Sequence, residues 1–269
     1  MRIRLTSDVH GDIPTIEAFS KLLSGDEFDM GVIAGDILDD GFTSEHIASA
    51  VASGALDSDD FVPELPGDDE DTDSYMARQR ERLRSTDGPF RKMIGFLETR
   101  ARFILEHAGK PVLVIRGNHD QSEWVSEGFV SNIEERRVDF DGYSFVGYRW
   151  TALDRSEAER RGDLQRLLRM VDRRTVLVTH DAPYGILDSV PDETGSARSI
   201  GSPYLRRLSD GAEPALHVFG HVHASFGRKG RCVNVSYPGS RAFVSVDLPG
   251  MEMTTIPVQG GNPVGGRSE

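Results

Sequence analysis

The sequence predicts an α/β protein, and three observations support this fold class. Five short apolar runs, each ending at a polar residue or a glycine, have the composition of buried parallel strands; they span residues 3–5, 30–34, 112–115, 176–178 and 216–219. Residues 155–173 have the spacing of an amphipathic surface helix. The chain of 269 residues, 38% of them hydrophobic, is long enough for one large domain with its own core.

We predict one domain over residues 1–258, followed by a flexible glycine-rich tail at 259–269. An insertion at about 41–110 interrupts the alternation of strands and helices. It has three interpretations: a lid that selects substrate, a subunit interface that supports an oligomer, or a solvated elaboration without a role. Loops of this length without a role are uncommon, which favours the first two.

Within the insertion, the acidic residues 57–73 have the composition of a mobile loop. Residues 75–107 have helical spacing, and Asp87-Gly-Pro89 predicts a turn that separates two helices. Further along the chain, residues 140–150 predict a strand or a hairpin around Asp141-Gly142.

The last third of the chain completes the predicted elements. In the helix at 155–173, four residues form the expected buried stripe: Leu164, Leu167, Leu168 and Val171. Three more runs predict the closing strands of a second sheet: 232–237, 242–248 and 252–258. The apolar runs alone do not distinguish two sheets from a single doubly wound sheet.

Composition excludes several classes of function. A net charge of −13 argues against nonspecific duplex DNA binding, which needs clustered Lys and Arg, and nucleic acid is therefore disfavoured as a partner. No stretch approaches the roughly 20 apolar residues of a membrane span, and the Met1-Arg-Ile-Arg start leaves no signal peptide. The single Cys232 allows no internal disulfide. We therefore expect a cytoplasmic protein.

Five polar motifs follow the five apolar runs: Asp8-Val-His10, Gly35-Asp36, Gly117-Asn118-His119-Asp120, Thr179-His180 and Gly220-His221-Val222-His223. In open α/β sheets, ligands bind beyond the carboxyl ends of the strands, where these motifs fall. Residues at i and i+2 of an extended segment share a side, so each D-x-H or H-x-H pair is expected to face one site.

Each motif by itself has an ordinary interpretation. A Gly-Asp pair can be a turn or a helix cap, Gly-Asn is a strong turn former, and a lone buried histidine usually has a hydrogen-bonded ring. Five unrelated turns would not supply carboxylates, an amide and imidazoles at successive strand ends. Five of the eight histidines lie in these motifs, and the joint pattern therefore indicates a metal site.

In this order and over almost the full length, the motifs resemble those of the calcineurin-like metallophosphoesterase superfamily: D-x-H, G-D, G-N-H-D/E, H and G-H-x-H. The resemblance implies a two-sheet α/β sandwich flanked by helices. It also implies two divalent metal ions. The first would be bound by Asp8, His10 and His223 and the second by Asn118, His180 and His221, with Asp36 bridging both.

The sequence departs from the family pattern at one ligand motif. The fourth motif reads Thr-His-Asp-Ala-Pro-Tyr-Gly rather than Gly-Gly-His, which leaves His180 intact. The later turn Tyr237-Pro-Gly-Ser240 is similar to the N-P-G-S turn of many smaller members.

The mixed oxygen and nitrogen ligands suit Mn²⁺, Fe or Zn²⁺, and the sequence does not choose between them. Such a site predicts in-line attack on phosphorus by a hydroxide that bridges the metals. His119 would be the general acid for the leaving group or would stabilise phosphoryl charge. Asp39 resembles the carboxylate that orients this histidine in phosphoprotein phosphatases, and Asp120 is the competing candidate. For both, a loop carboxylate that faces water is the alternative.

The resemblance favours a phosphodiesterase over a phosphoprotein phosphatase. In the latter, the second motif extends to G-D-x-V-D-R-G, whereas Asp40 here replaces the arginine. Three hypotheses follow: a hydrolase of phosphodiesters or other small organic phosphates, a phosphomonoesterase or pyrophosphatase with the same site, and a weakly catalytic metal-bound interaction scaffold. An exonuclease is disfavoured by the acidic composition. Arg116 and Arg241 lie near the motifs and are candidates to contact substrate phosphate, although Arg116 is equally suited to pair with a nearby carboxylate.

Overall fold

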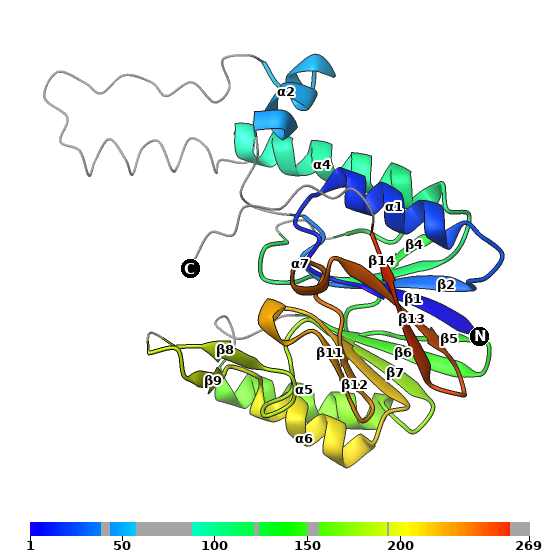
Figure 1. Cartoon of the computed structure of the whole chain (residues 1–269), viewed down its shortest axis with the longest axis vertical. Coiled ribbons are helices and arrows are strands. Elements are labelled where there is room, and N and C mark those ends of the chain that lie inside the picture. The colour runs from blue at the N-terminus through cyan, green and yellow to red at the C-terminus, as the bar shows by residue number, and fades with distance from the viewer. Residues whose placement is uncertain (39–43, 58–87, 121–123, 150–155, 193, 259–269) are drawn as a thin grey trace, which may run out of the picture.

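Two six-stranded sheets pack face to face between two layers of helices in the computed structural model (Figure 1). The structure describes residues 1–38, 44–57, 88–120, 124–149, 156–192 and 194–258. The prediction of a two-sheet α/β sandwich flanked by helices is confirmed, including the choice of two sheets over one.

In the first sheet, five of the six strands run in one direction and one runs in the opposite direction. In order across the sheet, its strands are β14 (Glu252–Pro257), β13 (Ala242–Asp247), β1 (Arg2–Thr6), β2 (Met30–Ala34), β3 (Val112–Ile115) and β4 (Val130–Asn132). The prediction that residues 242–248 and 252–258 close a second sheet is wrong. They extend the first sheet, because β13 pairs antiparallel with the open edge of β1.

The second sheet has the strand order β11 (Gly227–Lys229), β12 (Cys232–Asn234), β10 (Leu216–Phe219), β7 (Thr175–Thr179), β6 (Tyr143–Tyr148) and β5 (Arg137–Phe140). Its four central strands are parallel, and β11 and β5 are antiparallel edges. The hairpin predicted around Asp141-Gly142 is confirmed as the turn between β5 and β6.

Helices cover both outer faces (Figure 1). The first sheet is covered by α1 (Ile13–Leu23) and α4 (Pro89–Glu106), with α2 (Ser44–Ala52) packed against α4. The second sheet is covered by α5 (Glu157–Met170) and α6 (Pro203–Ala212). Short elements complete the chain: β8 (Ser189–Pro191), β9 (Ala197–Ser199), the 3-10 turn η1 (His223–Ser225) and α7 (Tyr237–Ser240), which occupies the predicted Tyr-Pro-Gly-Ser turn.

The helix predicted at 155–173 is confirmed as α5, but its buried stripe is narrower than expected. Leu167 and Val171 are buried, Leu164 is half-buried, and Leu168 is 41% exposed.

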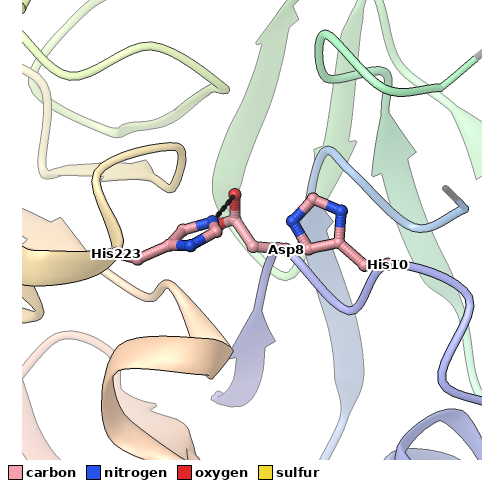
Figure 2. A group of neighbouring side chains, drawn as sticks. All are labelled: Asp8, His10 and His223. Carbon is pink, nitrogen blue, oxygen red and sulfur yellow. Dashed lines mark hydrogen bonds and ion pairs between the residues drawn. The ribbon is translucent and has the colours of Figure 1, made fainter. Parts of the chain in front are cut away.

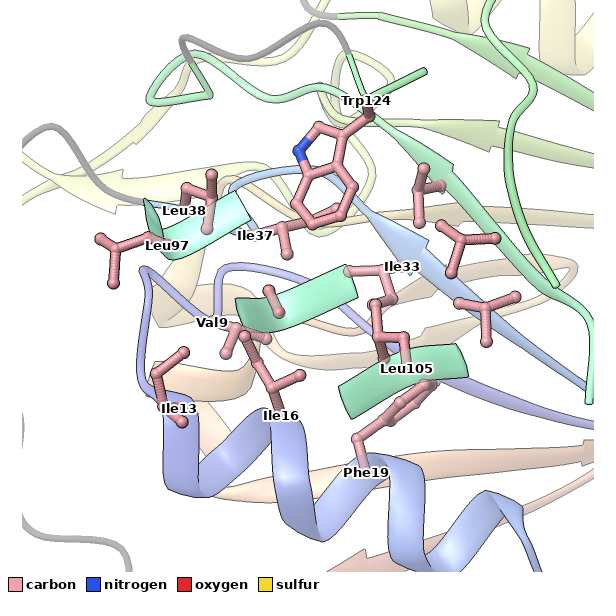
Figure 3. Close-up of a cluster of buried hydrophobic side chains, with 14 of the residues drawn as sticks. Val9, Ile13, Ile16, Phe19, Ile33, Ile37, Leu38, Leu97, Leu105 and Trp124 are labelled. Carbon is pink, nitrogen blue, oxygen red and sulfur yellow. The ribbon is translucent and has the colours of Figure 1, made fainter. Parts of the chain in front are cut away.

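The packing beneath the first sheet's helices fixes the chain that carries two of the polar motifs (Figure 3). Val9 and Ile37 lie next to Asp8 and Asp36 in sequence, and both are buried in the cluster that α1 and α4 cover. Burying an aliphatic side chain of this size contributes about 1.5–3 kcal/mol. Packing therefore holds the backbone at both motifs in place.

The described parts of the insertion contain one helix that was not predicted, α2, and one that was. The second helix predicted after Asp87-Gly-Pro89 is confirmed as α4, which begins at Pro89. The acidic loop and the tail at 259–269 lie outside the described residues, so the single domain at 1–258, the insertion at 41–110 and the tail remain predictions. In the part of the chain that the structure describes, no helix is long and apolar enough to span a membrane.

His217 on β10 is buried three residues before the Gly220-His221 motif. Its Nε2 lies 2.9 Å from the Thr179 hydroxyl, and burial lowers the pKa of its ring to about 3. Between pH 6.5 and 3 the unfolded chain binds a proton at this position that the folded chain excludes. Stability should therefore fall as the pH drops through this range.

We predict that His217→Gln reduces the pH dependence of the free energy of unfolding. From pH 7.5 to 5 the wild type should lose about 2 kcal/mol more than the variant, given an unfolded pKa of about 6.5. Urea unfolding at both pH values measures this, with the exposed His107→Gln as control. Equal losses in the wild type and His217→Gln would contradict the prediction.

Candidate metal centre

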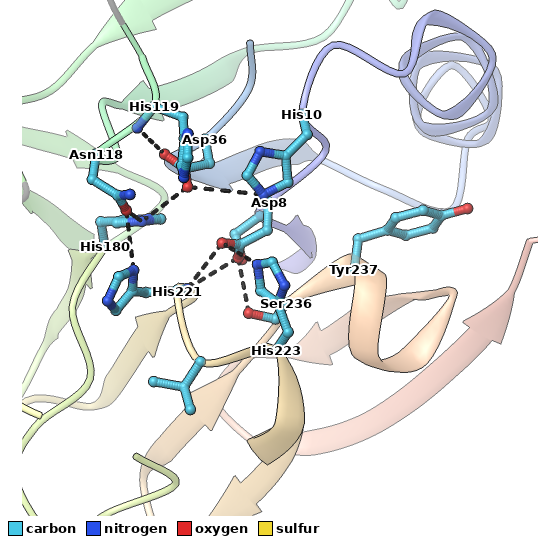
Figure 4. Close-up of polar contacts among 12 residues, drawn as sticks. Asp8, His10, Asp36, Asn118, His119, His180, His221, His223, Ser236 and Tyr237 are labelled. Atoms are coloured by element: carbon cyan, nitrogen blue, oxygen red, sulfur yellow. Dashed lines mark hydrogen bonds and ion pairs between the residues drawn. The ribbon is translucent and has the colours of Figure 1, made fainter. Parts of the chain in front are cut away.

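The polar motifs meet at the carboxyl edge of the two sheets (Figure 4). They follow β1, β2 and β3 of the first sheet and β7 and β10 of the second, so residues far apart in sequence form one cluster. The structure brings together all seven predicted ligands: Asp8, His10, Asp36, Asn118, His180, His221 and His223.

One side of the cluster contains Asp8, His10 and His223 (Figure 2). Their donor atoms lie within 4.8 Å of one another, and His223 Nε2 is 3.2 Å from Asp8 Oδ1. The buried Nε2 of His10 has no hydrogen-bond partner among the described residues. A buried ring nitrogen that lacks a partner is costly, and a divalent cation would satisfy it. The set fits the first predicted metal.

The other side of the cluster is centred on the side-chain oxygen of Asn118. Asn118 Oδ1 is 2.9 Å from His180 Nε2 and 3.0 Å from His221 Nδ1. Asp36 Oδ2 is 3.3 Å from His180 Nε2 and 3.9 Å from His10 Nε2, so its carboxylate lies between the two sides. This is the position that a bridging ligand needs.

The backbone brings the ligands together by a route that the sequence did not predict. Asp8, His10, Asp36 and His221 all have positive φ angles, between 50° and 66°. They are therefore not in extended backbone, and the i, i+2 argument for their shared direction is wrong. A left-handed residue other than glycine costs about 1–3 kcal/mol. Hydrogen bonds from Asp8 N to Gly35 O (3.0 Å) and from His10 N to Asp36 O (2.9 Å) hold the two turns against each other.

Two motif glycines are required by close approach. A Cβ on Gly117 would lie 2.1 Å from Asp36 Oδ1, and a Cβ on Gly220 would lie 2.3 Å from Asp8 Oδ2. Real Cβ atoms do not approach oxygen so closely. The G-N and G-H pairs therefore let one motif pack directly on the carboxylate of another, which excludes the interpretation of these glycines as ordinary turns.

Asp8 is held by groups that the sequence analysis missed. The buried hydroxyls of Ser7 and Ser236 both donate to Asp8 Oδ2, the latter at 2.8 Å. The His221 N–H donates to both Asp8 oxygens at 3.1 Å. Oδ2 is thus occupied by serines while Oδ1 faces His223. Of these contacts, only the one from Ser236 could have been expected from the sequence, because Ser236 directly precedes the Tyr237-Pro-Gly-Ser240 turn.

A backbone carbonyl fixes the orientation of the His180 ring. Its Nδ1 lies 2.9 Å from the Ala34 carbonyl oxygen, which can only accept, so Nδ1 carries a proton. Nε2 therefore points toward Asp36 and Asn118. A backbone carbonyl behind a histidine is a common arrangement for metal ligands.

The ionisable groups of the cluster shift one another's pKa values. Burial opposes ionisation of Asp8, but the His223 hydrogen bond and the charge of His180 outweigh it and hold the Asp8 pKa well below its usual value. Burial likewise opposes ionisation of Asp36, and His180 lowers its pKa. Against its own burial, Asp36 and Asp8 raise the pKa of His180 to about 10. A cation in the cluster would take the place of this proton.

Asp120 has a structural role rather than facing water. It is 8% exposed, and its oxygens accept hydrogen bonds from the N–H groups of Gly117 and Leu38 at 2.9 Å and of Ile37 at 3.3 Å. Burial and the charge of Asp36 raise the Asp120 pKa to about 7. The alternative of a solvated carboxylate is wrong for Asp120, which joins the second and third motifs.

Four further residues were predicted to act at the site: His119, Asp39, Arg116 and Arg241. His119 is half-buried, its N–H donates to Asp36 Oδ1 at 2.9 Å, and its ring meets that of His10 edge-on with centroids 5.1 Å apart. Asp39 lies outside the described residues. Arg116 makes a two-pronged ion pair with Glu134, with Nη2 to Oε2 at 2.8 Å. Arg241 is exposed where α7 ends.

The sequence model of the calcineurin-like phosphoesterase family matches residues 1–225. The chain belongs to the calcineurin-like phosphoesterase family. The UPF0046 protein K07C11.7 of Caenorhabditis elegans is 27% identical over 169 residues, which are 53% of this chain and 54% of that protein. The match thus spans about half the length of this curated relative.

Solved structures of low sequence identity share the fold. A dimetal phosphatase from Danio rerio superposes with a TM-score of 0.54 at 11% identity, covering 96% of both chains. The protein TT1561 of Thermus thermophilus superposes with a TM-score of 0.54 at 16% identity, covering 94% of this chain and 97% of that one. The family to which the chain belongs generally binds two divalent metals.

We predict that Gly220→Ala weakens metal binding without unfolding the protein. The added Cβ must displace the Asp8 carboxylate, whose position the first metal needs. We expect at least a tenfold rise in the metal dissociation constant, by analogy with disturbed outer contacts of other metal sites. Competition with a chelator measures this. Gly95→Ala on α4, where a Cβ meets open space, is the matched control and should leave metal affinity unchanged.

Proposed function

We propose that this protein hydrolyses phosphodiesters with the help of two divalent metal ions. The observation that carries the proposal is the convergence of carboxylate, amide and imidazole donors in one cluster, where the buried Nε2 of His10 has no hydrogen-bond partner among the described residues. Bound divalent ions would act as Lewis acids and would lower the pKa of a coordinated water. Asp8, His10 and His223 would hold one ion, Asn118, His180 and His221 the other, and Asp36 both.

His119 is proposed to act on the substrate. Its backbone is fixed by Asp36 Oδ1, and its half-buried ring stands edge-on to His10, beside the cluster. From there an imidazolium could donate a proton to the leaving alkoxide or stabilise phosphoryl oxygens. Asp39 is the proposed partner that holds this protonated ring. A donor atom of His119 also lies within 4.8 Å of those of His10 and Asp36, so a ligand role is the competing assignment.

The preference for diesters rests on the charge that a substrate brings. A monoester dianion needs more positive charge around it than a diester monoanion, and phosphatases supply arginines for this purpose. Here Asp40 stands at the position of that arginine, and Arg116 is bound to Glu134. These features favour a small phosphodiester over a phosphomonoester or pyrophosphate. The intact His119 argues against a scaffold that lacks turnover, because a scaffold needs no group that acts on a leaving oxygen.

Ligand chemistry and composition support proposals for the metal, the compartment, the substrate class and the oligomer surface. Mixed oxygen and nitrogen ligands suit Mn²⁺, with Fe and Zn²⁺ as alternatives. The free thiol of Cys232 is buried, and burial raises its pKa, which agrees with a reducing cytoplasm. The substrate is proposed to be a small organic phosphate rather than nucleic acid, and the insertion at 41–110 is the proposed surface for any oligomer.

Hydrolysis of two nitrophenyl esters tests the proposal. The Mn²⁺-loaded wild type should hydrolyse bis-p-nitrophenyl phosphate faster than p-nitrophenyl phosphate, and Asn118→Ala should lower the rate at least a hundredfold because it disturbs the second metal set. Faster turnover of the monoester would favour the phosphatase alternative. Tight binding of two metals without turnover of either ester would favour the scaffold.

His119→Asn separates the two assignments of this residue. If His119 is a proton donor and not a metal ligand, the variant should still bind two metals per chain. Its turnover of the diester should be lower by about 10²–10⁴. The alkaline limb of the pH–rate profile should also change, because the proton donor whose deprotonation lowers the rate at high pH is gone. Metal analysis of the purified variant is the control. Loss of one metal would assign His119 as a ligand.

A further inference from the structure

The amino ends of the strands in the second sheet carry a group of arginines in a groove. Two adjoining cavities of about 530 and 640 Å³ lie here and share Arg173, Ala215 and Met251 in their walls. Four arginines line them: Arg173, Arg174, Arg228 and Arg231. We call this region the arginine groove. Cavities of this size accommodate a small organic ligand.

The arginine groove lies at the opposite edge of the sheets from the metal cluster. Arg174 directly precedes β7 and Arg231 directly precedes β12, whereas His180 follows β7. A strand of five residues such as β7 is about 17 Å long, so the two regions are separate sites. Figure 1 shows the turn between β13 and β14, which forms one wall, at the same edge as the N-terminus.

Among the residues that the structure describes, two of these arginines are held by backbone carbonyls and have no carboxylate partner. Arg228 donates from Nε to the Gly230 carbonyl at 2.7 Å and from Nη1 to the Met251 carbonyl. Arg231 donates from Nη1 to the Pro214 carbonyl at 3.2 Å. A carbonyl fixes the guanidinium but carries no net charge, and each group has further N–H donors. The described lining holds four arginines against two carboxylates, Asp141 and Glu213, in a chain of net charge −13.

Apolar residues form another part of the wall. Leu248, Pro249 and Met251 come from the turn between β13 and β14 of the first sheet, and Pro214 and Ala215 precede β10 of the second. The Arg228 bond to the Met251 carbonyl joins the two sheets across this seam. A ligand that fits has an anionic end for the guanidinium groups and an apolar body for the floor.

We propose that the arginine groove is a second binding site, for a small phosphorylated organic molecule with an apolar or aromatic part. Guanidinium groups match phosphate oxygens in geometry and charge, and their attraction does not depend on bound metal. The metal cluster and the arginine groove thus bind phosphates by different means at opposite edges. The inference does not require that the metal site prefer diesters.

Phenylphosphonate is a suitable probe, because its phosphorus–carbon bond resists phosphoesterase chemistry and its ring supplies the apolar part. Calorimetric titration of the metal-loaded wild type should give two equivalents, one at each edge. Arg228→Ala/Arg231→Ala should retain one equivalent, with affinity for the other lowered at least tenfold. Hydrogen exchange of the wild type should show protection at residues 227–231 on binding. Methylphosphonate should bind the groove more weakly because it lacks the ring.

The matched control is Arg161→Ala/Arg206→Ala, which removes the same charge from two ion pairs outside the groove. It should retain both equivalents, and turnover of bis-p-nitrophenyl phosphate should be unchanged in both double variants. Arg174→Glu is a second test at an exposed position, and it should also weaken the groove equivalent. Groove and control variants that both keep the wild-type number of equivalents, or that lose equal affinity, would overturn the proposal.

Discussion

The burial of two carboxylates in one cluster is the constraint on which the rest of the site depends. Asp8 and Asp36 are almost fully buried, with donor atoms within 4.8 Å of those of His180. Charges so removed from water are costly unless they are paired and hydrogen-bonded. The structure meets this cost with the ring of His180, whose pKa the two carboxylates raise, with the serine hydroxyls on Asp8, and with backbone N–H groups. Each of these groups also fixes a neighbouring motif, so the interactions that compensate the buried charges are the ones that assemble the site.

The sequence predicted which residues meet, but not how the backbone brings them together. Apolar runs that end in polar residues identify buried parallel strands, and ligand chemistry at successive strand ends identifies a shared site. Positive φ angles at Asp8, His10, Asp36 and His221 are not visible in such patterns, because any of these residue types also occurs in extended backbone. The contributions of Ser7 and Ser236 were missed for a similar reason, since a buried serine has no spacing that distinguishes it from a solvated one.

The error about the last strands has a comparable physical cause. Residues 242–248 and 252–258 have strand patterns, but a pattern of burial does not say which of two sheets a strand joins. The choice is made by pairing of β13 with β1, whose other edge is already occupied by β2. This pairing also extends the first sheet to the seam, where its turn toward β14 meets the second sheet. If β13 and β14 had joined the second sheet, the arginine groove would lack one wall.

The two edges of the sandwich therefore differ in how they acquire positive charge. At the carboxyl edge, carboxylates and histidines form an anionic cluster that becomes attractive to phosphate only when cations are bound. At the amino edge, guanidinium groups are positive at every physiological pH. Because local fields of this kind are strongest over short distances in a salt solution, the net charge of −13 does not determine where an anionic ligand binds. The same parallel strands that gather the acids at one end place arginines such as Arg174 and Arg231 at the other, so one topology supports both kinds of anion recognition.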